Sequence, residues 1–336
     1  MACGKWGVMK QAKVWLRPSI GLTVVASVAA LALVPNTSGL MPALMVLPAW
    51  MVIATLIACL YGVGWAAITG DPSPSRSLQH FIKTRRPHIA SVALIMLLAG
   101  ANLISFMWVK TLLNYMIPFR ADPWLAQADF DLFGGHEPWS ILHVFNFSGS
   151  GFVYHPVWFI LLIFGLLMAA AAEPSTKRSA VLLSYFVLWT VVGPLIHSLL
   201  PAAGPIFYER LGYGARYAGI PSSPEVKQVA DYLWDIYASK RFGAASGISA
   251  MPSMHVAMST WTVIAFHQFA RRFLPIALIG WVVITVLSIA LGWHYATDGI
   301  VGSVAAIVTY AVLSKAMHAR ASAMRTEVPA LAPQMG

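Results

Sequence analysis

The sequence predicts an all-α protein, a polytopic membrane helical bundle of about eight transmembrane helices. The chain of 336 residues is 58% hydrophobic and only 10% charged, whereas a soluble domain carries about 25% charged residues. Its mean hydropathy is +0.70. Apolar runs of about 17 residues or more, which is enough to cross the hydrocarbon core of a bilayer, recur along the whole chain.

Each of these runs is expected to form one membrane-spanning helix. In chain order they cover residues 20–34, 41–68, 88–117, 155–172, 180–200, 254–270, 274–293 and 299–316. The first run follows a basic segment but no small-residue cleavage site, which predicts a retained span and not a cleaved signal peptide.

The lysines and arginines predict the orientation of the bundle. With the N-terminus placed in the cytoplasm, fifteen of the 22 lysines and arginines fall on that side. This asymmetry follows the positive-inside rule. We therefore expect both termini in the cytoplasm of an integral protein of a plasma, inner or secretory-pathway membrane. The net charge of +10 then reflects topology and does not indicate nucleic-acid binding.

Two long loops are expected on the outer or lumenal face, at residues 118–154 and 201–253. The first reads as an interfacial loop. The second contains an amphipathic helix pattern that begins with Ser223 as N-cap and Pro224 in the first turn, and ends near Ser239. The chain is then one domain in three parts: residues 1–117, an N-terminal tail and three additional spans; 118–316, a core of five spans and the two long loops; and 317–336, an inner C-terminal tail.

Two short motifs are expected to meet at the outer face. Ser249–His255 precedes the run 254–270, and His294–Asp298 follows the run 274–293. Two such runs joined by a tight link form an antiparallel pair, whose open ends lie together. Ionisable residues at the end of a span are costly without a function, so His255, His294 and Asp298 form a candidate site.

The residue types suit phosphoryl transfer. A carboxylate on one nitrogen of the His294 ring would fix its tautomer and raise the basicity of the other nitrogen, which could attack phosphorus. His255 could protonate the leaving alkoxide and later accept a proton from the incoming hydroxyl. A metal site would use the same three residues as ligands, but no fourth ligand has motif spacing, and we expect neither metal nor cofactor.

The combination of Pro252-Ser253-x-His255 with His294-x-x-x-Asp298 resembles the second and third motifs of the type 2 phosphatidic acid phosphatase superfamily. The resemblance covers about residues 118–316. It implies an integral-membrane lipid phosphatase or lipid phosphotransferase in which Ser253 binds phosphate, His255 is the general acid, His294 the nucleophile and Asp298 its orienting partner.

The arginine that usually precedes the nucleophilic histidine in this superfamily is absent, because residues 289–293 read Ile-Ala-Leu-Gly-Trp. This departure resembles the branch of inositol phosphorylceramide synthase and its bacterial relatives. The residues expected to bind the substrate phosphate instead are Arg216, Lys240 and Arg241, with Tyr208 and Arg210 as weaker candidates.

The sequence-based hypothesis is a lipid phosphotransferase that moves a phospho-headgroup from a phospholipid donor to a lipid alcohol through a phosphohistidine. A lipid phosphatase acting on phosphatidic acid or on isoprenyl phosphates is the alternative, with water in place of the alcohol. A proton-coupled transporter or flippase is less favoured, because its relay residues should lie near mid-bilayer, whereas these lie at span ends.

Overall fold

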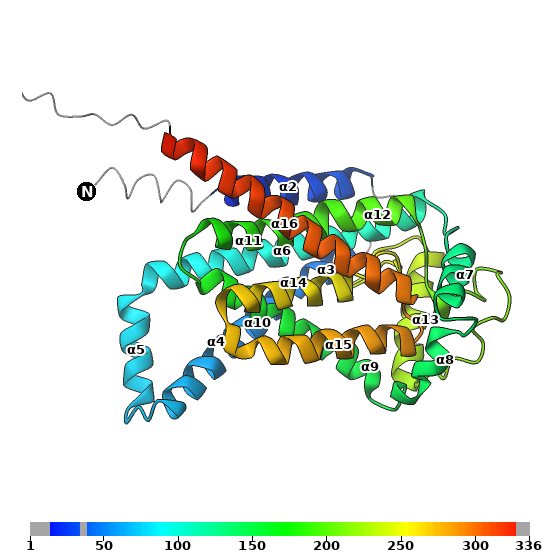
Figure 1. Ribbon diagram of the computed structural model, residues 1–336, viewed down its shortest axis with the longest axis horizontal. Coiled ribbons are helices and arrows are strands. Elements are labelled where there is room, and N and C mark those ends of the chain that lie inside the picture. The colour runs from blue at the N-terminus through cyan, green and yellow to red at the C-terminus, as the bar shows by residue number, and fades with distance from the viewer. Residues whose placement is uncertain (1–13, 34–38, 327–336) are drawn as a thin grey trace, which may run out of the picture.

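The computed structural model describes residues 14–33 and 39–326, and every regular element within these ranges is a helix (Figure 1). Within these ranges, seven helices are long and apolar enough to cross a membrane. They cover Leu16–Leu33, Leu40–Ile68, Arg86–Met116, Ser150–Ala171, Thr176–Leu199, Arg271–Ala290 and Ala296–Ala323. The predicted fold class, a polytopic helical membrane bundle, is confirmed. The end of the first predicted run, at residue 34, lies outside the described residues.

The α-helices, in chain order, are α2 (Leu16–Leu33), α3 (Leu40–Leu44), α4 (Val46–Ile68), α5 (Pro74–Thr84), α6 (Arg86–Met116), α7 (Asp122–Leu132), α8 (Pro138–Leu142), α9 (Ser150–Phe152), α10 (Trp158–Ala171), α11 (Thr176–Val187), α12 (Gly193–Leu199), α13 (Pro224–Ala238), α14 (Met254–Phe269), α15 (Leu274–Ala290) and α16 (Ala296–Thr326). Two π-helical turns, η2 (Val153–Val157) and η3 (Leu188–Val192), interrupt the helices that contain α10 and α11. Short 3₁₀ turns are η1 (His143–Phe145), η4 (Pro205–Phe207) and η5 (Arg271–Phe273).

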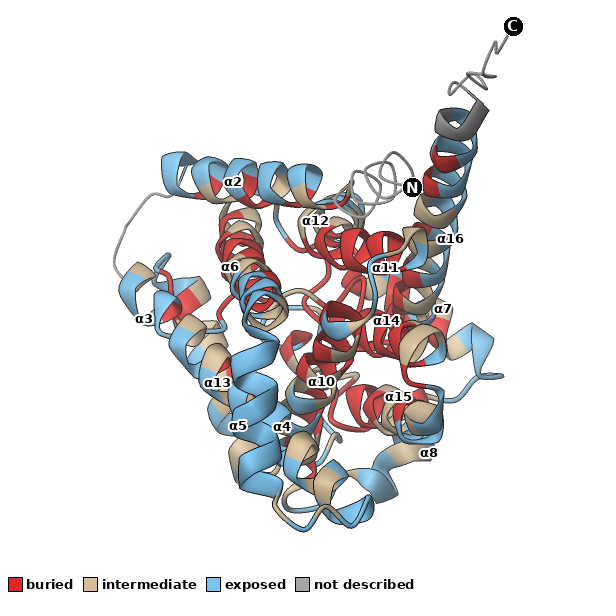
Figure 2. Ribbon diagram, turned by 90° about the vertical axis from the view of Figure 1, so that its left-hand side faces the viewer, coloured by how far each residue is buried: buried red, intermediate tan, exposed pale blue. Residues whose placement is uncertain are grey.

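The remaining expected span, α14, is the central helix of the bundle. It has 16 residues, so its length is about 24 Å at 1.5 Å per residue, shorter than the other seven spans. α14 contacts α10, α11, α15 and α16. Buried residues concentrate on α10, α11 and α14, while α2, α4 and α5 expose much of their surface (Figure 2). The short helix α14 is therefore surrounded by other helices, whereas longer spans such as α2 and α4 have faces that lipid can contact.

Two segments outside the predicted spans contain helices. α5 lies between the predicted runs 41–68 and 88–117, and α7 lies within the loop 118–154, which was expected to be interfacial. In both, a proline occupies the first turn, where its missing N–H costs nothing. The amphipathic helix predicted in the second long loop is confirmed as α13, with Ser223 as N-cap and Ser239 as C-cap.

The connections of the bundle gather at two opposite ends (Figure 1). α5, the α14–α15 link and the C-terminal part of α16 lie at one end. α7, α8 and α13 lie at the other end, where α14 begins and where α15 passes into α16. Because α14 and α15 run antiparallel, the start of α14 lies at the same end of the bundle as the end of α15.

Candidate active site

The structure brings the two histidines and the aspartate of the predicted motifs together. α14 and α15 form an antiparallel pair joined by η5. The ring centroids of His255, on the first turn of α14, and His294, after α15, are 6.3 Å apart. Nδ1 of His294 lies 3.5 Å from Oδ2 of Asp298, which is on the first turn of α16. Three side chains from three helix ends therefore share one site.

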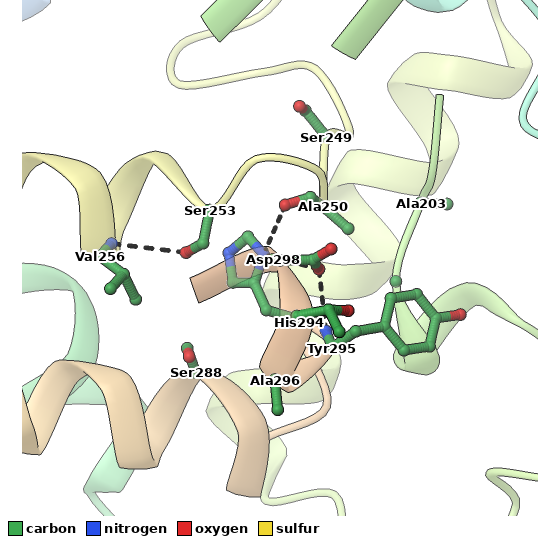
Figure 3. A network of polar contacts seen from close by, with 12 residues as sticks. Ala203, Ser249, Ala250, Ser253, Val256, Ser288, His294, Tyr295, Ala296 and Asp298 are labelled. Atoms are coloured by element: carbon green, nitrogen blue, oxygen red, sulfur yellow. Dashed lines mark hydrogen bonds and ion pairs between the residues drawn. The ribbon is translucent and has the colours of Figure 1, made fainter. Parts of the chain in front are cut away.

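The closest polar partner of His294 is a backbone carbonyl. Its Nδ1 lies 2.9 Å from the oxygen of Ala250 (Figure 3). A carbonyl oxygen can only accept, so Nδ1 carries the ring proton and Nε2 presents a lone pair. Nε2 has no hydrogen-bond partner among the described residues. The sequence analysis assigned tautomer control to Asp298 alone and missed the Ala250 carbonyl.

Backbone hydrogen bonds hold Asp298 against the first motif. Its Oδ2 accepts from the amide of Tyr295 at 2.8 Å (Figure 3), and its carbonyl accepts from the amide of Ser253 at 3.1 Å. Ser253 is fully buried and is the N-cap of α14, where its hydroxyl accepts from the amide of Val256. The predicted phosphate-binding role of Ser253 stays a prediction.

Helix α7 supports the site through two buried carboxylates. Asp129 accepts from the amides of Ala296 and Thr297, at 2.5 and 2.9 Å, and so caps the start of α16. Asp122 accepts from two amides at residues 203–204 and from the hydroxyl of Tyr295. Burial raises the pKa of both carboxyl groups, although these hydrogen bonds act in the opposite direction. α7 thus fixes the backbone that follows His294 and the loop at residues 203–204.

Aromatic rings surround His255. Tyr154 stacks on its ring at 4.6 Å, and the ring of Trp158 lies at 4.2 Å. The Trp158 indole also donates to the His255 carbonyl at 3.0 Å. The adjacent His155, whose ring is 5.3 Å away, has a buried Nε2 without a partner. Tyr154 and His155 both belong to the π-turn η2, a local distortion that is common at functional sites.

A cavity of about 620 Å³ adjoins both histidines, a size typical of small-molecule and cofactor sites. Its walls are mostly apolar and come from α4, α6, α10, α13 and the loop before α14. Lys110, on α6, is the one lysine or arginine among the described residues that line it. Lys110 was absent from the predicted site.

The cations predicted to bind phosphate do not line this cavity. Arg216 pairs with Glu137 at 2.6 Å and donates to the carbonyl of Ala126 at 3.0 Å. Arg210 pairs with Asp231. The remaining candidates are Lys240 and Arg241, which are exposed, and Tyr208, which is buried among other tyrosines. Their roles stay predictions, and none of them is among the residues that line the cavity beside the histidine pair.

One sequence signal could have identified Lys110. It is the only charged residue in the predicted run 88–117, and an ionisable residue inside a span is a functional candidate by default. Asp129 lies in the loop 118–154, which the sequence analysis read as interfacial. His155 resembled several other histidines near span ends, and no sequence signal separated it from them.

Comparison with known proteins agrees with the geometry. A family model described as the PAP2 superfamily matches residues 124–312, which include both motifs and α7 from its third residue. The comparison with curated proteins found no match, and neither did the comparison with solved structures. Because the matched segment covers more than half of a helical membrane protein, and holds both histidines and the aspartate, the chain belongs to the PAP2 superfamily.

Proposed function

We propose that this protein is a lipid phosphotransferase in which His294 carries the phospho-headgroup as a phosphohistidine. The observation that carries the proposal is the fixed ring of His294. The Ala250 carbonyl and Asp298 occupy the side of Nδ1, which leaves Nε2 unpaired in a residue that lines the cavity. Membership of the PAP2 superfamily is compatible with a lipid phosphatase or phosphotransferase.

The proposed reaction has two steps, and in each step one bond to phosphorus forms, one breaks and His255 transfers one proton. Nε2 of His294 attacks phosphorus, the bond from phosphorus to the donor alkoxide breaks, and His255 gives that alkoxide its proton. In the second step the hydroxyl of the acceptor attacks phosphorus, His255 takes its proton and the P–N bond breaks. The apolar walls of the cavity favour a lipid alcohol as the acceptor, whereas water would make the protein a phosphatase.

Trapping of the covalent adduct tests the mechanism. The purified protein in lipid nanodiscs is incubated with phosphate-labelled phospholipids and quenched in base, where a P–N bond is stable. His294→Ala should give no labelled protein. His255→Ala should still form the adduct from a donor with a good leaving group but release it slowly, because the proton acceptor of the second step is missing. His318→Ala, at the exposed far end of α16, is the control and should behave as wild type.

Mass spectrometry of the peptide that contains His294 locates the adduct. Added water, or an added lipid alcohol whose mass differs from that of the donor's own diacylglycerol, identifies the acceptor. A base-stable adduct on His255 would exchange the two roles. Full activity without an adduct on either histidine would refute the covalent scheme. Release of labelled phosphate, with no transfer to an added lipid alcohol, would make the protein a phosphatase.

A further inference from the structure

Lys110 is a cation in an apolar cavity without an anionic partner. Its ammonium makes no hydrogen bond or ion pair with any described residue. The nearest aromatic contact is the ring of Phe106, whose centroid lies 5.7 Å from Nζ. An unpaired charge inside a membrane span is costly, and such residues pair with a counter-charge or mark a ligand pathway.

The loop that leads into the first motif packs against the stem of Lys110. A Cβ added at Gly247 would lie 2.8 Å from Cε and 3.1 Å from Cγ of Lys110, and Gly247 has a φ of +93°. Glycine tolerates this conformation and this close approach. Gly247 lies only eight residues before His255 in the loop that also contains Ala250. The lysine stem therefore lies beside this loop and beneath the ring of Phe106, and Lys110 lines the same cavity as both histidines.

The other cations of the outer loops are engaged or exposed. Arg216 is neutralised by Glu137, and both Arg210 and Lys227 pair with Asp231. A phosphate bound beside His294 carries at least one negative charge, and none of these three cations lines the cavity wall. Among the described lysines and arginines, Lys110 is the one that lines the cavity and could bind this phosphate.

We propose that Lys110 binds the phosphate of the substrate, and that the cavity takes an anionic lipid whose phosphate lies between Lys110 and His294. The inference rests on the proposed function, but it names a residue that lies before the segment matched by the superfamily model. A lysine is suited to this role as a compact point charge for phosphate oxygens. The apolar walls, which include Phe159, Phe207 and Leu233, would cover the part of the lipid next to the headgroup.

Binding of a non-reactive lipid separates this inference from catalysis. The probe is a short-chain phosphatidic acid analogue with a phosphonate headgroup and brominated acyl chains. Bromine quenches tryptophan, and Trp158, Trp189 and Trp293 line the cavity. Lys110→Met should weaken binding of the phosphonate about 10- to 100-fold, as for loss of a charged hydrogen bond, and Lys110→Arg should keep most of it. Lys315→Met, the same substitution at an exposed site on α16, is the matched control and should bind as wild type.

Two further ligands identify what the lysine recognises. Brominated diacylglycerol, which lacks the anion, should bind wild type and Lys110→Met equally. Inorganic phosphate should displace the phosphonate lipid only at far higher concentration, because it fills none of the apolar walls; displacement at similar concentration would contradict the lipid assignment. Equal phosphonate affinity in wild type and Lys110→Met would overturn the inference, even with turnover and the His294 adduct intact. A Lys110-dependent affinity in a protein without turnover would support the anionic-lipid site and reject the proposed reaction.

Discussion

At the scale of single residues, the ring of His294 is controlled by two acceptors of different kinds. The Ala250 carbonyl lies 2.9 Å from Nδ1 and the Asp298 carboxylate 3.5 Å from it. In a serine protease triad the aspartate alone sets the histidine tautomer, and its replacement by asparagine lowers turnover about 10⁴-fold. Here the carbonyl can keep the tautomer when the carboxylate is lost. An orienting carboxylate fixes the histidine tautomer and also stabilises positive charge on the ring. In this protein the two effects can be measured separately, because the Ala250 carbonyl can fix the tautomer without Asp298.

This separation leads to a prediction for Asp298. Asp298→Asn should lower turnover by clearly less than about 10⁴-fold, because Ala250 still accepts from Nδ1. Asp298→Ala should lower it further, because the amide of Tyr295 also loses its acceptor. Turnover of both variants under single-turnover conditions, with thermal unfolding as a folding check, measures the difference. A loss of about 10⁴-fold in Asp298→Asn would mean that the charge of the carboxylate dominates and the carbonyl contributes little.

At the scale of elements, α7 connects the site to a helix that is distant in sequence. The Asp129 carboxylate accepts hydrogen bonds from amides at the start of α16, which lie more than 160 positions later in the chain. A capping carboxylate satisfies amides that have no partner within their own helix. Because α16 carries Asp298 and follows His294 directly, the position of α7 determines where both side chains lie.

We therefore predict that Asp129 is a positioning residue. Asp129→Ala leaves one buried and one partly buried amide unpaired, at a cost of about 1–3 kcal/mol for the buried one, so it should lower the unfolding temperature and turnover together. Asp129→Asn retains one acceptor oxygen and should recover part of both. Asp131→Ala, on the exposed face of the same helix, is the matched control. Normal turnover in Asp129→Ala would show that the start of α16 needs no support from α7.

Helix α13 could be predicted from the sequence, whereas helix α7 could not. α13 was predicted because Ser223 and Pro224 mark its start and its apolar residues recur at helical spacing. In α7 the buried face combines Leu125 with two aspartates, and hydrophobic periodicity does not detect a face whose acids bind distant amides. The same limit applies to Lys110, because its position in an apolar run does not reveal which side of α6 faces the cavity.

At the scale of the whole molecule, the spans were predictable because a bilayer imposes a minimum length on each apolar run. The predicted runs and the helices agree within a few residues at most ends, although α16 extends well beyond residue 316. The exception in length is α14, which is covered by neighbouring helices and not by lipid. The predicted run 254–270 already had nearly this length, because the apolar run ends where the Arg271–Arg272 link begins.

The orientation of the bundle in the membrane is the remaining whole-molecule prediction. The charge asymmetry of the loops puts the end with α5 and the α14–α15 link in the cytoplasm, and the end with α7, α13 and the histidines outside. In a background in which Cys3 and Cys59 are replaced by serine, Ser222→Cys, exposed before α13, should react with a membrane-impermeant maleimide on intact cells. Arg271→Cys should react only after permeabilisation.

Arg271 is preferred to its neighbour because Arg272 packs over the rings of Tyr61, Trp65 and Phe273. Reaction of Arg271→Cys on intact cells, with Ser222→Cys protected, would place the histidines at the cytoplasmic face and require a cytoplasmic lipid donor.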